Sequence, residues 1–510
     1  MPPRTSAPSL ARPRATTLRD RAVAECTAGA RALLAGHVEA ALTRYAAGVA
    51  LAPRDADVAA VHGVALRNAN RLQDAQRELI RAIALDPQRA DSYLQLGHTF
   101  FMVKDYVQAA DALLAAATLK RSDAYTWRDT AEAMRLSHRL ADGLQIARHA
   151  ASLDDRDPSI ANTLAVLMHR NGALDEALAL CRRVRAQAPD ESGLALTHGM
   201  LLRTCDQHTE GWALFERRLD LPEFLQRPHP PASPRWDGTP LDGRHIVVRG
   251  EQGLGDQVQF LRWTALLGEQ GASRITVQCA VPLMRLLQTM PSIDDVVPMD
   301  AIAPPHDVHA DVMSLPHLLQ TGGDMLSRLV PYLQAPRVNA LLEARLSAAP
   351  RNGRLRLGLV WGGTSIHTED CSRSMPLATL LPVMQRRDVQ IVVLQQGPSR
   401  AQLDALAPSV RETLLDVADH CTDMADTAQV LTDCDVVLSV DTSVAHVAGA
   451  VGVPTWVMVA HPAEWRWGRD RSDSLYYPHC TVLRQQERGD WSAVVDSVQR
   501  SIDAWHQAHQ

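Results

Sequence analysis

Apolar residues follow two different spacings along this chain, and the change from one to the other divides it in two. Up to about residue 223 they recur at helical spacing, as in Ala75, Leu79, Ile80 and Ile83. From residue 245 onward, short apolar runs alternate with helical stretches. The pattern predicts a helical first part and an α/β second part.

Small residues recur every 34 positions in the helical part. One series is Gly29, Gly63, Gly97, Ala131, Ala165 and Gly199, and a second is Ala41, Ala75, Ala109, Gly143, Ala177 and Gly211. Prolines at 53, 87 and 189 mark the turn to the next unit. Small residues at two fixed places let paired helices approach closely. This pattern resembles the tetratricopeptide repeat, and it predicts about six units of two helices over residues 22–225.

The fourth and sixth units match the repeat least well. Neither has proline at the turn position, and the sixth has Arg218 where a small residue usually packs. We expect the sixth unit to be a terminal repeat that forms an interface. Stacked repeats of this kind make an extended docking surface, which predicts a bound partner.

The second part begins after a proline-rich linker, residues 226–240. Its alternation of strands and helices predicts parallel sheets with right-handed crossovers. We expect two Rossmann-like halves, residues 241–350 and 351–510, with ligands in the cleft beyond the carboxyl ends of the strands. The predicted strands are 245–249, 274–279 and 295–298 in the first half, and 355–361, 390–394, 435–440 and 455–459 in the second.

Composition and charge exclude several classes of protein. The 510 residues are 46% apolar with a formal net charge of −6, so the chain lacks the excess of positive charge that is typical of nucleic-acid-binding proteins. No run of eighteen apolar residues predicts a spanning helix, and the first 21 residues predict a disordered tail rather than a secretory signal. The eight scattered cysteines predict free thiols in a reducing cytoplasm.

A glycine-rich turn, residues 250–256, follows the first predicted strand and ends in Asp256. Glycines let a ligand approach the backbone. Asp256 falls near the start of the next helix, where it can cap the helix or point into the cleft as a general base. Composition favours capping, and both interpretations stay open.

A second motif, residues 439–449, follows the strand that ends at Val440. Asp441, Thr442 and Ser443 open a helix, and free amides at a helix start suit a diphosphate. His446 lies one turn further on. The alternative is an ordinary capped helix with a histidine packed at its side.

Two other stretches hold candidate residues. After the strand that ends at Trp361, Gly362 and Gly363 leave room for a ligand, and Arg373 can neutralise a phosphate or simply be solvated; His367 is a weaker candidate. Trp465 and Trp467 can stack on a base or sugar, although core packing is the favoured interpretation.

In order, GEQGLGDQVQFLRW, LGLVWGG, VVLSVDTSVAHVAGAVGVPTWVMV, EWRWGRDRSDSLYYP and LRQQERGDW resemble bacterial tetratricopeptide-repeat proteins with a C-terminal glycosyltransferase domain. That domain is related to the lipopolysaccharide heptosyltransferases and has the GT-B architecture. The resemblance implies that Asp256 is the catalytic base and that no metal or cofactor is needed beyond the nucleotide-sugar donor. The candidate donor-binding residues are Gly253, Gly255, Gln257, Gly362, Gly363, Arg373, Asp441, Thr442, Ser443 and His446.

The expected function is transfer of a sugar to a protein Ser or Thr hydroxyl, because repeat-bearing relatives include enzymes that glycosylate proteins, notably flagellin. The repeats would then dock the acceptor. One alternative is a lipopolysaccharide or lipid-linked sugar acceptor, with the repeats recruiting a partner. Another is a non-catalytic scaffold with a degenerate transferase domain. The expected location is the cytoplasm.

Overall fold

The computed structural model describes residues 17–225, 231–321, 326, 328–363 and 370–509. The chain divides into two compact units, Met1–Asn171 and Gly172–Gln510. The division falls within the repeats, whereas the sequence suggests a joint at residues 226–240. The first helix begins at Leu18, inside the segment expected to be a tail.

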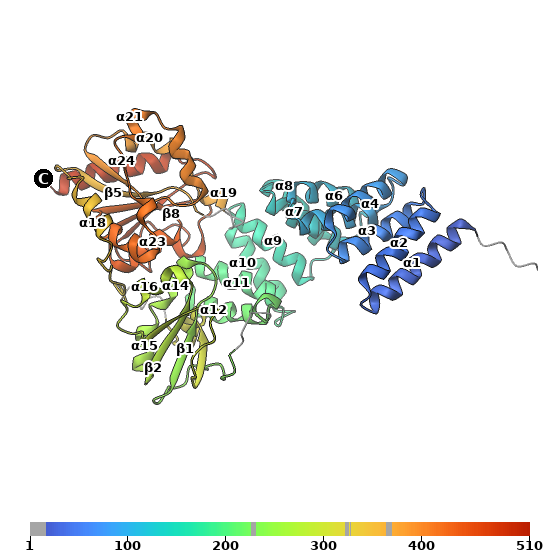
Figure 1. Ribbon diagram of the computed structural model, residues 1–510, viewed down its shortest axis with the longest axis horizontal. Helices are drawn as coiled ribbons and strands as arrows, with labels where there is room; N and C mark the ends of the chain where they lie inside the picture. Colours follow the sequence, from blue (N-terminus) through green and yellow to red (C-terminus); the bar gives the residue numbers. More distant parts are fainter. Residues whose placement is uncertain (1–16, 226–230, 322–325, 327, 364–369, 510) are drawn as a thin grey trace, which may run out of the picture. The chain divides into compact units, whose positions relative to one another are not determined.

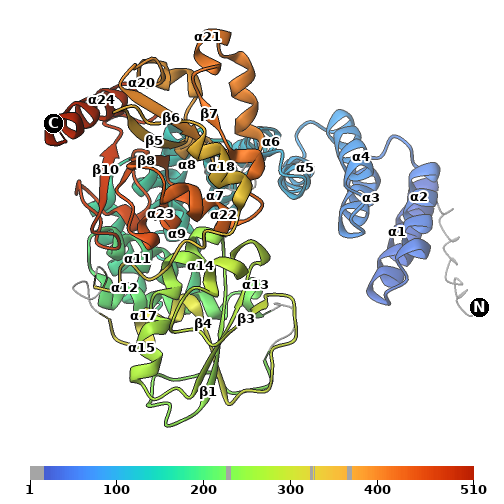
Figure 2. The same cartoon turned by 60° about the vertical axis from the view of Figure 1, so that its left-hand side comes forward.

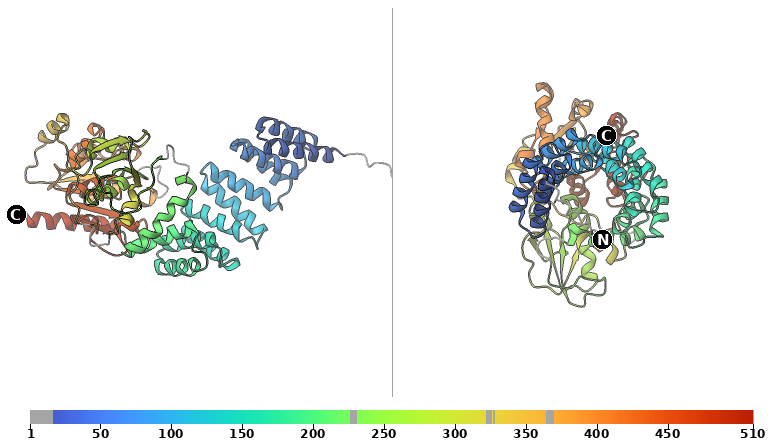
Figure 3. Two further views of the ribbon diagram at one scale, coloured as in Figure 1. Left: turned by 90° about the horizontal axis from the view of Figure 1, so that it is seen from below. Right: turned by 90° about the vertical axis from the view of Figure 1, so that its right-hand side faces the viewer.

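Twelve helices form the repeats, as predicted, in six consecutive pairs (Figure 1). Their bounds are α1 Leu18–Leu34, α2 Val38–Leu51, α3 Ala56–Asn68, α4 Leu72–Leu85, α5 Ala90–Met102, α6 Tyr106–Leu119, α7 Ala124–Leu136, α8 Leu140–Leu153, α9 Pro158–Arg170, α10 Leu174–Arg185, α11 Ser192–Thr204 and α12 His208–Phe215. In the first unit, successive pairs stack side by side along the array (Figure 3).

The small residues act as the repeat pattern predicts. A Cβ added at Gly63 would lie 2.7 Å from Cγ of Leu79, and one at Gly97 would lie 2.6 Å from Cγ of Leu113. Each glycine therefore allows a leucine of the second helix to pack against the backbone of the first. Aspartates cap several first helices; Asp157, for example, accepts the Ser159 and Ile160 amides just before Pro158.

The second unit contains α10–α12, a short connection of η1 Glu216–Asp220 and α13 Pro222–Leu225, and two parallel sheets. The first sheet has the order β3-β2-β1-β4. Its elements are β1 His245–Arg249, α14 Leu254–Leu261, α15 Thr264–Glu269, β2 Arg274–Cys279, η2 Val281–Leu283, α16 Met284–Leu287, β3 Asp295–Pro298, β4 Val308–Asp311, η3 Val312–Ser314 and α17 Leu315–Leu318.

The second sheet has the order β10-β9-β8-β5-β6-β7 and follows α18 Ala340–Ser347. Its elements are β5 Leu355–Val360, α19 Asp370–Arg373, η5 Leu377–Leu380, α20 Leu381–Met384, β6 Val389–Val393, η6 Pro398–Ala405, α21 Pro408–Arg411, β7 Leu415–Asp416, η7 Ala418–His420, α22 Met424–Leu431, β8 Val436–Val440, α23 Ser443–Val451, β9 Thr455–Val459, η8 Trp465–Trp467, β10 Cys480–Arg484 and α24 Ser492–Ala508.

The predicted fold class, a repeat solenoid followed by two Rossmann-like halves, is confirmed. Figure 2 shows the two sheets with α14, α22 and α23 between them, and α14 packs directly against α23. The buried strands are nearly continuous apolar runs, as parallel sheets covered on both faces require. Three strands were not predicted: β4, β7 and β10.

The sixth repeat is an interface-forming unit, as expected. Arg218 of η1 is 1% exposed and donates to both carboxylate oxygens of Glu251 at 2.8 and 3.0 Å. Glu251 also accepts the Met313 amide at 2.9 Å. Burial alone would lower the pKa of Arg218, but Glu251 and Glu216 outweigh it and hold that pKa above its ordinary value. The end of the repeats is therefore tied to the loop between β1 and α14.

All eight cysteines are free thiols, and most are buried. Burial raises the pKa of Cys181, Cys279 and Cys434 to about 12, so these thiols stay protonated. Across the part of the chain that the structure describes, no helix is both long and apolar enough to cross a bilayer.

Two histidines at the end of the repeats should make the fold sensitive to acid. Burial lowers the pKa of His198 and His208 to about 4, from 6.5. As the pH falls below 6.5, these two histidines become protonated in the unfolded chain, whereas in the folded chain they stay neutral down to about pH 4. Stability is therefore complete above pH 6.5 and falls between pH 6.5 and 4, by about 2 kcal/mol per histidine at pH 5.

The measurement is the melting temperature of the full chain at pH 7.5 and pH 5.0. His208→Leu should reduce the loss on acidification, whereas the same change at the exposed His37 should not. An equal loss in the wild type and in both variants would contradict this assignment.

Candidate active site

Asp256 lies in the first turn of α14, directly after the glycine-rich turn. Its Oδ2 accepts the Gly253 amide at 3.0 Å, and Gly253 is the N-cap of the helix. The capping interpretation is therefore confirmed. The carboxylate is still partly accessible, with 16% of the side chain exposed.

The other oxygen of Asp256 pairs with Arg466, which lies in η8 of the C-terminal half. Arg466 also donates to Gln259 Oε1 at 2.7 Å and pairs with Glu464 at 2.8 Å. Burial alone would lower the pKa of Arg466, but Asp256, Glu464 and Asp441 outweigh it and raise that pKa. Arg466 thus remains charged and joins the two halves at Asp256.

Gly255 places the start of α14 against α23. A Cβ at this position would lie 2.7 Å from Cδ2 of His446 and 3.4 Å from Cα of Ser443. The structure therefore brings together the two predicted motifs, one from each half. Asp256 and the N-terminus of α23 face the same interface between the sheets.

The N-terminus of α23 is arranged as an anion site would be. Thr442 is its N-cap and is 8% exposed, and the Thr442 hydroxyl lies 3.0 Å from the Ser439 hydroxyl rather than bonding the helix amides. Ser443 is the first helical residue. Amides at such a helix start carry partial positive charge and attract phosphate.

Arg373 lies beside this helix start. Its guanidinium donates to the Asp441 carbonyl at 3.1 Å and to Asp370 at 3.3 Å, and 20% of the side chain is exposed. A Cβ at Gly363 would meet both Asp370 and Arg373. The glycine therefore lets Arg373 fold back towards Asp441, and this places Arg373 among the donor-site candidates.

The Gln395 side chain, which the sequence analysis did not identify, holds Gly362 in place. Gln395 accepts the Trp361 and Gly362 amides at 2.9 and 2.8 Å and donates to the Gly362 carbonyl. A Cβ at Gly362 would lie 2.4 Å from the Ser399 hydroxyl oxygen. His367 lies outside the described residues.

His446 is buried and packed, as the structural alternative proposed. Its Nδ1 lies 3.0 Å from the Tyr477 hydroxyl, and its ring stacks on Trp467 with centroids 5.7 Å apart. Burial lowers the pKa of His446 well below 6.5, and the nearby arginines add to the effect. The ring is therefore neutral, and it shapes the interface rather than adding charge.

Gln257 does not join the other candidates. Its side chain is 1% exposed, and its Oε1 accepts the Ala280 amide at 2.9 Å. It therefore fastens the loop after β2 within the N-terminal half. Trp465 and Trp467 are 6% and 1% exposed, which confirms core packing.

Sequence reasoning missed Arg466 and Glu464, although both stand in the tryptophan motif that it singled out. The signal was available in the pattern itself. A charged residue between two buried tryptophans must find a partner, because an unpaired buried charge is costly. Nothing in the sequence identified Asp256 as that partner.

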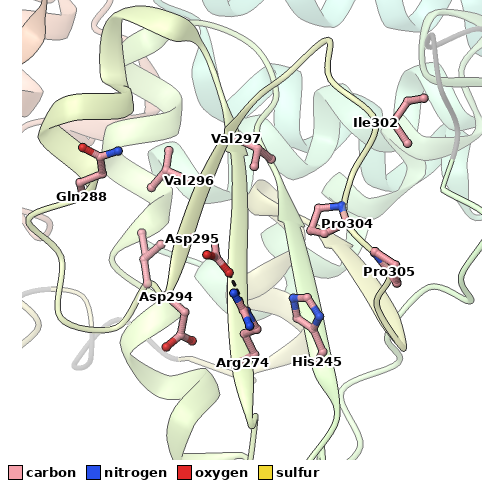
Figure 4. Close-up of a pocket in the computed structure, with 11 residues that line it drawn as sticks. His245, Arg274, Gln288, Asp294, Asp295, Val296, Val297, Ile302, Pro304 and Pro305 are labelled. Atoms are coloured by element: carbon pink, nitrogen blue, oxygen red, sulfur yellow. Dashed lines mark hydrogen bonds and ion pairs between the residues drawn. The ribbon is translucent and has the colours of Figure 1, made fainter.

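A hollow of about 690 Å³ lies on the N-terminal sheet, away from these residues (Figure 4). His245, Arg274 and Asp295 line it at the amino ends of β1, β2 and β3, and Arg274 pairs with Asp295 at 2.6 Å. Ligands of parallel sheets bind at the opposite, carboxyl ends. Its size alone therefore does not make it the reaction site.

These features define a helical-repeat protein with an α/β region of two parallel sheets. Residues 377–460 match Glycosyltransferase family 9 (heptosyltransferase). The chain thus combines helical repeats of the tetratricopeptide type with a C-terminal α/β region that is similar to heptosyltransferases over residues 377–460.

Other comparisons are more distant. Protein FlbA of Caulobacter vibrioides is 24% identical over 370 residues, which are 65% of this chain and 59% of FlbA. MamA 41-end from Desulfovibrio magneticus RS-1 is 20% identical, with a TM-score of 0.32 over 34% of this chain and 99% of that one. Pseudomonas aeruginosa pilF is 18% identical, with a TM-score of 0.34 over 41% and 97%. Because these TM-scores are low, the evidence for the repeat architecture is the helices α1–α12 of this chain and not the similarity to those structures.

Adding a methyl group at Gly255 should disturb the contact between the halves. His446 cannot move aside easily, because Trp467 and Tyr477 enclose its ring. Gly255→Ala should therefore lower stability by about 1–3 kcal/mol, measured by denaturant unfolding.

Gly268→Ala is the matched control, because a Cβ there meets open space on α15. It should leave stability unchanged or raise it by up to about 1 kcal/mol. Equal effects of the two substitutions would show that α14 and α23 are not in tight contact.

Proposed function

We propose that this protein transfers a sugar from a nucleotide-sugar donor to a Ser or Thr hydroxyl of a protein acceptor, for which flagellin is a candidate. The observation that carries the proposal is the meeting of α14 and α23. It places a carboxylate from one half and a helix N-terminus with an arginine from the other half at one interface.

The donor diphosphate would lie at the start of α23. The amides after Thr442 and the hydroxyl of Ser443 would bind it, and Arg373 would balance its negative charge. Gly362 and Gly363 would let the donor approach the backbone. Stabilising the leaving diphosphate in this way lowers the barrier to its departure.

Asp256 would act on the acceptor. As the acceptor hydroxyl oxygen forms its bond to the anomeric carbon, its proton passes to the Asp256 carboxylate. The bond from the anomeric carbon to the diphosphate breaks, and the nucleoside diphosphate leaves with the electron pair. Each carboxylate oxygen has a second lone pair, so the cap and the ion pair leave room for this proton.

The repeats would hold the acceptor. A protein bound along α1–α9 reaches the transfer site at a high effective concentration. A lipopolysaccharide or lipid-linked sugar is the alternative acceptor, and the heptosyltransferase match over residues 377–460 favours it as the second candidate. In that case the repeats would recruit a partner protein.

Replacing the proposed base should separate catalysis from capping. Asp256→Asn keeps an oxygen that can accept the Gly253 amide but cannot take a proton at neutral pH. We expect the transfer rate to fall by about 10²–10⁴-fold, while nucleoside diphosphates still raise the melting temperature.

Asp307→Asn is the control, because Asp307 also accepts a backbone amide, that of His245 at 2.7 Å, at the opposite end of the same sheet. It should leave transfer unchanged. Full activity of Asp256→Asn would remove Asp256 from the chemistry.

Removing residues 1–171 should distinguish the two acceptors. This cut keeps α10–α12, which belong to the second compact unit. We expect transfer to a protein acceptor to fall by at least about tenfold as the docking surface is lost, with donor binding unchanged. Undiminished transfer to protein would refute docking, and transfer by the full chain to a lipid-linked sugar alone would establish the second candidate.

A further inference from the structure

Arg203, in α11 of the last repeat, is buried in an unusual way. Its guanidinium carbon lies 3.9, 4.4 and 4.1 Å from the ring centroids of Trp465, Trp212 and Phe215. Its Nε donates to the Gly199 carbonyl of its own helix, and among the described residues neither Nη atom has a hydrogen-bond partner. Aromatic faces rather than a carboxylate therefore hold this charge.

This arrangement costs stability. The side chain is fully buried, and burial lowers the pKa of Arg203 to about 9. An apolar side chain would fill the same space without desolvating a charge. Arg67 and Arg135 stand at the equivalent place in earlier repeats and are less completely buried. In the last repeat the arginine is enclosed because Trp212 and Phe215 of α12 and Trp465 of the α/β region close over it.

Trp465 connects Arg203 to the candidate site. The Arg466 guanidinium also lies over the Trp465 ring, 4.5 Å from its centroid. Both arginines therefore use one indole ring, and η8 holds that ring and Arg466 next to each other in the chain. Arg466 then contacts Asp256 and Gln259 in the N-terminal half. The contacts run without a break from α11 to the Asp256 carboxylate.

Trp212 of α12 also packs edge-on against the Trp465 ring, with centroids 5.5 Å apart. The ion pairs between the last repeats and the η8 region are weaker. Arg469 pairs with Asp175 of α10, and Arg471 pairs with Asp206 after α11, but the four side chains are between 24% and 74% exposed. Such surface pairs contribute about 0–1 kcal/mol each. The buried contacts of Trp465 with Arg203 and Trp212 are therefore the ones able to fix the position of η8, and Arg203 also shares the indole ring with Arg466.

We propose that Arg203 is a positioning residue for Asp256, acting through Trp465 and Arg466. The last repeat is then a working part of the transfer site as well as the end of a docking surface. This inference rests on the proposed function insofar as Asp256 is the base, and it adds a residue from the repeats to that site.

The test compares the full chain with Arg203→Met, which fills the aromatic cage without charge, and Arg203→Lys, which keeps the charge. We expect Arg203→Met to lower kcat by about tenfold to hundredfold, as displacement of a catalytic group does. The donor KM should change less than about twofold, since the diphosphate site is untouched. Arg203→Lys should restore most of kcat.

Arg217→Met is the matched control. Arg217 lies in η1 nearby and pairs with Asp220, and it should leave kcat unchanged. The double variant Arg203→Met, Arg466→Met should be no slower than Arg466→Met alone, because the two residues act in series. The proposal is overturned if the losses in kcat of the two single variants multiply in the double variant. It is also overturned if Arg203→Met keeps the wild-type kcat, or if this variant changes only KM.

A second double-mutant cycle measures stability and does not depend on activity. If Arg203 positions Asp256, the melting-temperature shift of Arg203→Met, Asp256→Asn should differ from the sum of the two single shifts. Non-additive shifts together with an active Asp256→Asn variant would uphold the link and refute the base. Additive shifts would overturn the link whatever the role of Asp256.

Discussion

The buried ion pair between Arg218 and Glu251 is the contact on which the arrangement of the second unit depends. Both side chains are withdrawn from water, and removal of either would break a buried charge pair, which costs several kcal/mol. Glu251 stands in the loop that leads to Asp256, so the conformation of this loop requires a residue from the end of the repeats. The enzyme-like part and the last repeats therefore form one folded body.

The fold was largely predictable because its patterns are local and repeated. Small residues such as Gly63 and Gly97 are spaced by the repeat itself, and strands such as Val436–Val440 are buried apolar runs. The strands that escaped prediction lack such runs. β4 reads VHAD and β7 has two residues, while β10 is an edge strand with an exposed threonine. Their pairing depends on a neighbouring strand rather than on their own composition.

The candidate site was predictable only in part, because the sequence shows local patterns but not which distant residues come into contact. Asp256, Thr442 and Ser443 each follow a strand and open a helix, and that position can be read from the sequence. The partners of Arg466 and Arg203 lie far away along the chain, and only the fold brings them together. Gln257 illustrates the converse: it stands beside Asp256 in sequence, but as the next helical residue it points to a different face and bonds the Ala280 amide.

The boundary between Asn171 and Gly172 has a consequence for how such proteins diversify. A solenoid unit contacts only its immediate neighbours, so whole units can be gained, lost or exchanged without remodelling distant ones. Repeats before this boundary are free to vary in that way. The helices after it, α10–α12, belong to the same compact unit as the sheets and are constrained by them. Evolution could therefore alter the length of the array while helices α10–α12 are inherited together with the two sheets.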